Sequence, residues 1–108
     1  MKSERKHDNR LKRIIMEPTA LGLPRPVWIA KETRIYDGYR LIGEPDILLF
    51  GDNTLYNIEY KCNDTQAQRI KAQRQLQCAE RFFRYIGYEG RIRNLMVSGR
   101  NFDVEVIQ

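Results

Sequence analysis

The sequence predicts one α+β domain in which two helices flank a mixed β-sheet, in the order α-β-β-β-β-α-β-β. Three observations predict this class. Apolar residues recur at helical spacing in a leading segment and in a long later segment, short apolar runs of strand length lie between and after them, and Gly- and Asn-containing turns separate these runs. The chain has 108 residues, which is the size of one small domain spanning residues 1–108.

The first helix is expected at residues 3–16, because Leu11, Ile14 and Ile15 fall on one face. Residues 21–26 are expected to form a loop, since they include two closely spaced prolines. The chain should therefore leave the helix through an irregular connection.

Strands should follow this loop. The Asp37-Gly38 pair is a hairpin signal, and the continuous apolar run Ile47–Phe50 is typical of a strand covered on both faces. Four strands are expected in this region, at residues 27–35, 40–42, 47–50 and 55–61. They should form a β-meander.

A long amphipathic helix should come next. Asn63-Asp64-Thr65 supplies helix-start residues, and Gly87 should end the helix. Between them the apolar stripe consists of Ala72, Leu76, Ala79, Phe83 and Ile86. A final strand pair is expected at residues 92–97 and 102–107.

The net charge of +5 is unevenly distributed. Residues 1–15 carry six Lys or Arg and two acids, a net +4, and residues 66–93 carry seven and two, a net +5, so the remaining residues hold a net −4. Two cationic segments around an acidic middle are expected if the middle binds metal ions and the flanks bind a polyanion. The alternative is that the basic residues only solvate two amphipathic helices.

The sequence contains no apolar run of the roughly 18 residues that a membrane helix needs, and no apolar segment follows the charged N-terminus. We therefore expect a soluble cytoplasmic protein without a membrane partner. Cys62 and Cys78 lack metal-site spacing and are expected to be reduced packing residues.

The chemistry-bearing residues lie on two neighbouring strands. Asp46 stands at the mouth of the apolar strand, and Glu59 and Lys61 lie on the next. Because side chains alternate along a strand, Glu59 and Lys61 should project from the same face roughly 6.6 Å apart. Asn57 should join them, which predicts one polar face and one core face.

If the two strands pair antiparallel, the carboxylates of Asp46 and Glu59 can converge. With the main-chain carbonyl of Tyr60 they would form an all-oxygen site suited to Mg²⁺ or Mn²⁺. Lys61 would hold the attacking water or the phosphate. The competing interpretations are an ion pair between Glu59 and Lys61 on an exposed sheet, and a turn-initiating role for Asp46.

Pro45-Asp46, followed after a turn by Glu59-Tyr60-Lys61, resembles the motif of the PD-(D/E)xK nuclease superfamily, which includes restriction endonucleases and archaeal Holliday junction resolvases. The resemblance implies a restriction-endonuclease-like fold over most of the chain. It departs from many resolvases in the proline-rich loop after the first helix, and Glu44 is an additional carboxylate.

The resemblance also implies an acid on the first helix that completes the metal site. Asp8 is favoured and Glu4, one turn earlier, is the alternative. It further implies a glutamine or lysine on the second helix near the metal-bound water or the phosphate, for which Gln73 is the candidate. Phosphate contacts are expected from the cations of that helix, namely Arg69, Lys71, Arg74, Arg81 and Arg84.

These expectations combine into a Mg²⁺-dependent DNA endonuclease that acts as a homodimer on duplex or branched DNA, with structure-selective cleavage of the kind that resolvases perform. Two alternatives remain open. One is a non-catalytic nucleic-acid-binding or regulatory module that retains the fold, and the other is a small subunit of a mobile-element excision system.

Overall fold

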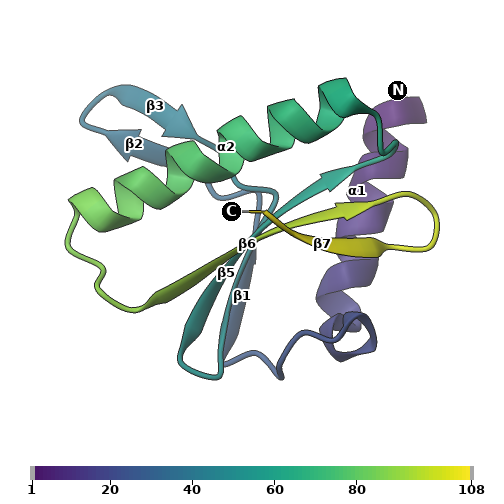
Figure 1. The fold of residues 1–108 in the computed structure, drawn as a ribbon, viewed down its shortest axis with the longest axis horizontal. Helices are drawn as coiled ribbons and strands as arrows, with labels where there is room; N and C mark the ends of the chain where they lie inside the picture. Colours follow the sequence, from purple (N-terminus) through teal and green to yellow (C-terminus); the bar gives the residue numbers. More distant parts are fainter. Residues whose placement is uncertain (1, 108) are drawn as a thin grey trace.

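The structure is a computed structural model that describes residues 2–107, with side chains described from residue 5 onward. It is an α+β fold with a mixed five-stranded sheet, two long helices and a separate two-stranded sheet (Figure 1). In chain order the elements are α1 (Lys2–Met16), the 3₁₀ helix η1 (Pro18–Leu21), β1 (Trp28–Lys31), β2 (Ile35–Asp37), β3 (Arg40–Gly43), β4 (Ile47–Gly51), β5 (Thr54–Lys61), α2 (Gln66–Tyr85), β6 (Arg91–Ser98) and β7 (Asp103–Ile107).

The large sheet has the strand order β1-β4-β5-β6-β7. Strands β5 and β6 pair parallel and the other neighbours pair antiparallel. A parallel pair needs a long crossover, and α2 supplies it. The mixed sheet and its two helices agree with the sequence prediction.

The expected strand at residues 27–35 is wrong in its extent. The chain forms two strands there, β1 in the large sheet and β2 in a hairpin with β3. The break lies at Glu32, whose backbone has a positive φ of 51°, a conformation that ends regular strand geometry. Five strands therefore precede α2 instead of four, and η1 occupies the start of the expected loop.

The turn between β4 and β5 is a two-residue hairpin in which Asp52 and Asn53 both have φ of 54°. This left-handed pair favours Asn and Asp, and its twist matches that of the flanking strands. It fixes the register in which Ile47 pairs with Ile58. The next residues outward in this antiparallel register are Asp46 and Glu59, so the turn brings the two carboxylates to the same end of the sheet.

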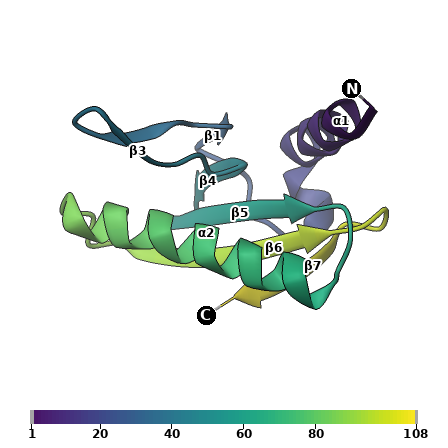
Figure 2. The same cartoon turned by 90° about the horizontal axis from the view of Figure 1, so that it is seen from above.

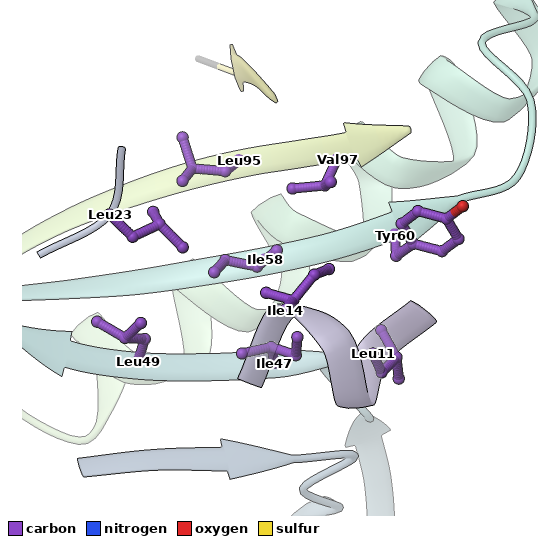
Figure 3. Packing of buried hydrophobic residues seen from close by; sticks show 9 residues of the cluster. All are labelled: Leu11, Ile14, Leu23, Ile47, Leu49, Ile58, Tyr60, Leu95 and Val97. Atoms are coloured by element: carbon purple, nitrogen blue, oxygen red, sulfur yellow. The ribbon is translucent and has the colours of Figure 1, made fainter. Parts of the chain in front are cut away.

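The two helices cover opposite faces of the sheet. Figure 2 shows α1 on one side of β5 and β6 and α2 on the other. The core under α1 is drawn in Figure 3 and consists of Leu11, Ile14, Leu23, Ile47, Leu49, Ile58, Tyr60, Leu95 and Val97. On the α2 face, Ala72, Leu76 and Ala79 are buried, as the helical spacing predicted, whereas Phe83 is half-buried and Ile86, after the end of α2, is exposed.

The polar face predicted for β5 is buried, which contradicts the competing interpretation of an ion pair on an exposed sheet. Asn57 is fully buried and Glu59 is only 3% exposed. Asn57 donates hydrogen bonds to the carbonyl oxygen of Leu76 in α2 and to Oδ1 of Asn94 in β6. Both faces of β5 are therefore covered, one by apolar packing and the other by a buried polar network beneath α2.

Candidate functional site

The candidate site lies at the end of β5, where the N-terminal parts of α1 and α2 approach the sheet from opposite sides (Figures 1 and 2). A surface pocket of about 630 Å³ opens there. Its lining consists of His7, Asp8, Glu32, Glu44, Asp46, Tyr60, Lys61, Cys62, Asn63 and Gln68. Five segments that are distant in the sequence contribute to it.

Asp46 is held in place by main-chain and side-chain contacts. Its Oδ2 accepts a 2.8 Å hydrogen bond from the amide of Tyr60, and its own amide donates to Oε1 of Glu59 at 3.3 Å. Its side chain is 14% exposed to solvent, so the carboxylate can be reached from the pocket. The structure thus brings the two predicted carboxylates together.

Glu59 occupies an unfavourable environment for a charged carboxylate. Burial, the negative charge of Asp46 and a hydrogen bond between the two carboxyl groups raise the pKa of Glu59 to about 9, against a smaller opposing effect of the Lys61 charge. Without a cation, Glu59 therefore carries a proton at neutral pH. Two neighbouring carboxyl groups repel each other when both are ionised, and a bound cation would offset this repulsion.

Lys61 lines the same pocket and is oriented by α2. Its Nζ donates a 2.8 Å hydrogen bond to Oε1 of Gln75. The sequence-based choice was Gln73, but Gln75 is the glutamine that accepts the hydrogen bond from Lys61, although both side chains are exposed. The two amides flank the buried stripe of α2 on opposite sides, and only one flank faces β5.

The first helix contributes two residues. Asp8 lines the pocket, but its carboxylate lies 2.7 Å from Nζ of Lys31 and 3.3 Å from Nζ of Lys12. Hydrogen bonds from Lys31 and then Lys12 lower the pKa of Asp8. The side chain of Glu4, the alternative acid, lies outside the described residues.

His7 is a site residue that was not predicted from the sequence. Its Nε2 lies 3.4 Å from Oδ2 of Asp46, and its ring packs against Tyr60 at a centroid distance of 5.9 Å. His7 precedes the buried Leu11 by four residues, and this spacing places both on the inward face of α1. That spacing was the available signal for it.

The cations of α2 fall into different surroundings. Arg69 forms ion pairs with Asp64 and Glu105, and Arg84 donates to the carbonyl oxygens of Tyr88 and Gly90. Arg74 lines a smaller pocket of about 320 Å³ together with Glu59 and Gln75. Lys71 and Arg81 are exposed.

The donor set tests whether a divalent cation fits. Among the described residues, no group of three or more His, Cys, Asp or Glu side chains is arranged to hold a metal ion. The carboxyl groups of Asp46 and Glu59 nevertheless converge. The amide of Tyr60 points at Asp46. Because the amide and the carbonyl of a strand residue are directed to the same neighbouring strand, the carbonyl of Tyr60 faces this side as well. A hard cation that keeps several waters, such as Mg²⁺, fits two carboxylates and one carbonyl.

No protein-family model, curated protein or solved structure matches this chain. The resemblance to the PD-(D/E)xK superfamily therefore stays an expectation from the sequence motif. No helix among residues 2–107 is long and apolar enough to cross a membrane.

Proposed function

We propose that this protein is a Mg²⁺- or Mn²⁺-dependent endonuclease with a restriction-endonuclease-like fold that hydrolyses phosphodiester bonds of duplex or branched DNA. The single observation that carries the proposal is the convergence of Asp46 and Glu59 at the end of two paired strands, with Lys61 in the pocket that Asp46 lines. An ion pair on an exposed sheet would not require the buried position of Glu59.

Asp46, Glu59 and the carbonyl of Tyr60 would hold the cation, with Asp8 of α1 as the additional carboxylate at the pocket. When bound, the cation supplies Lewis-acid stabilisation of the reacting phosphoryl group and lowers the pKa of a water. The residues of the chain do the positioning. The amide of Tyr60 fixes the Asp46 carboxylate, and Gln75 directs the ammonium group of Lys61, which would bind the phosphate or orient the attacking water.

A domain of this size holds one such pocket, so cleavage of both strands of a duplex or junction would require two copies. A twofold-symmetric homodimer is the economical arrangement. Sedimentation or light scattering of the purified protein, alone and with DNA, measures this directly.

The function is tested by incubating the protein with labelled duplex, single-stranded and four-way junction DNA in Mg²⁺, Mn²⁺ or EDTA. Cleavage is expected only with the metals and should be lost in Asp46→Ala. Metal-independent binding without cleavage of any substrate would contradict an enzyme and would instead support a non-catalytic nucleic-acid-binding module.

A further inference from the structure

The solvent-facing side of α1 carries a concentration of positive charge next to the candidate site. Arg5, Lys6, Arg10 and Arg13, which we call the cationic face of α1, line a pocket of about 440 Å³ together with Asn9. No acidic side chain lines this pocket among the described residues. Mixed charges are usual on a solvated helix face, so a pocket lined by four cations and no described acid calls for a different explanation.

Among the described side chains, no acid neutralises the cationic face. None of its four side chains pairs with a carboxylate among the residues whose side chains the structure describes. Lys12 on the same helix pairs with Asp8 and Arg69 on α2 pairs with Asp64, whereas Lys71, Arg74 and Arg81 of α2 also form no ion pair with the described residues. Like charges left together on one surface are relieved by an anion from outside the chain.

Two of the four cations are held in position by an aromatic ring. The guanidinium carbons of Arg10 and Arg13 lie 5.5 Å and 5.9 Å from the ring centroid of Phe102, in the turn between β6 and β7. Arg10 also reaches the carbonyl oxygen of Arg100 at 3.5 Å, in the same turn. Cations with restricted freedom lose less entropy when they bind a phosphate, which favours a binding role over simple solvation.

The position of this face relative to the site is set by the helix. His7 and Asp8, which line the site pocket, lie between Lys6 and Asn9 along α1. At 1.5 Å per residue, the span from Arg5 to Arg13 is roughly 12 Å, enough to follow several phosphates of a strand. The aromatic contact between Phe102 and Tyr60, at 6.0 Å, connects the same turn to the site.

We propose that the cationic face of α1 binds the phosphates of the nucleic-acid strand that reaches the Asp46 pocket, and that α1 rather than α2 is the principal track for the substrate. This inference depends on the proposed function for its ligand class. It replaces the sequence-based assignment of the phosphate contacts to α2, where Arg69 is already paired with Asp64 and Glu105.

The test measures binding without chemistry. Affinity for a labelled DNA duplex is determined in EDTA by fluorescence anisotropy over a series of salt concentrations. Three double variants of equal charge change are compared with the parent: Arg5→Gln with Lys6→Gln, Arg10→Gln with Arg13→Gln, and Lys71→Gln with Arg81→Gln on α2. Removing one cation that binds a phosphate should reduce the slope of log affinity against log salt by about 1, so each α1 pair should reduce it by about 2.

The α2 pair is expected to change the slope by less than half as much as either α1 pair. An equal effect of all three pairs, or a larger effect of the α2 pair, would overturn the inference. If Arg10 and Arg13 prove necessary for folding, the Arg5 and Lys6 pair still decides the outcome. If DNA affinity depends on the α1 cations but no metal-dependent cleavage occurs, the endonuclease proposal fails and the α1 inference stands. If cleavage occurs but the α1 variants bind DNA like the parent, the α1 inference fails and the endonuclease proposal stands.

Discussion

Asp46 and Glu59 face one another at the end of β4 and β5, and the amide of Asp46 donates a 3.3 Å hydrogen bond to Oε1 of Glu59. The two carboxyl groups therefore lie close together in a poorly solvated environment. A proton, a cation or a mutation can each relieve this arrangement, and each has a measurable consequence.

The metal-free protein should lose stability as the pH rises. The pKa of Glu59 is about 9 in the folded chain against a reference value of 4.5, so between these values the native state keeps a proton that the unfolded state releases. The free energy of unfolding therefore falls with rising pH across this window. Thermal melts in EDTA from about pH 5 to about pH 9 should show a falling Tm.

Glu59→Gln should flatten this dependence, because the amide keeps the shape of the carboxyl group and cannot ionise. Glu44→Gln is the matched control, since Glu44 lines the same small pocket as Glu59 but is exposed and paired with Arg34. A Glu59→Gln protein that melts with the parental pH dependence would show that the raised pKa is not the cause.

Mg²⁺ or Mn²⁺ should stabilise the protein, and more strongly at high pH, where a proton no longer competes for Glu59. A cation at 100 times its dissociation constant would add about 2.7 kcal/mol to the free energy of unfolding. Asp46→Asn and Glu59→Gln should both reduce the shift in Tm. Asp52→Asn, in the exposed turn between β4 and β5, should keep it; an equal reduction there would indicate nonspecific ion binding.

Asp46→Ala should lower the rate of metal-dependent cleavage by at least about 1,000-fold, since several kcal/mol of transition-state stabilisation depend on the cation. DNA affinity in EDTA should stay the same or increase, because a negative charge near the phosphate is removed. Parallel cleavage and anisotropy assays measure the two effects. Cleavage at the parental rate would exclude Asp46 from the reaction.

Lys61→Ala should reduce the cleavage rate more than it reduces metal affinity. Gln75→Ala should reduce the rate by about tenfold, because a hydrogen bond to a charged group is worth about 1.5 kcal/mol. Gln73→Ala, two residues away on the same helix, is the control and should cleave normally. The assignment of Gln75 is wrong if both glutamine variants behave alike.

Local patterns determined the elements that depend on near neighbours. The spacing of Leu11 and Ile14 predicted the buried face of α1, and the Gly51–Thr54 turn predicted the antiparallel pairing of β4 and β5. The pairing of Asp46 with Glu59 follows from that turn, because a short hairpin fixes register. The break between β1 and β2 at Glu32 could not be predicted in the same way, because it depends on one backbone torsion that no residue pattern indicates.

The rest was decided by how α1 and α2 pack on the sheet. Alternation along β5 placed Glu59 and Asn57 on one face, but only the docking of α2 turned that face from exposed to buried and raised the pKa of Glu59. Likewise, helical spacing left Gln73 and Gln75 equivalent as flanks of one stripe until the helix was oriented over Lys61. The periodicity of the sequence predicts which residues share a face. The burial of that face, its hydrogen-bond partners and the interactions between its charges depend on the element packed against it.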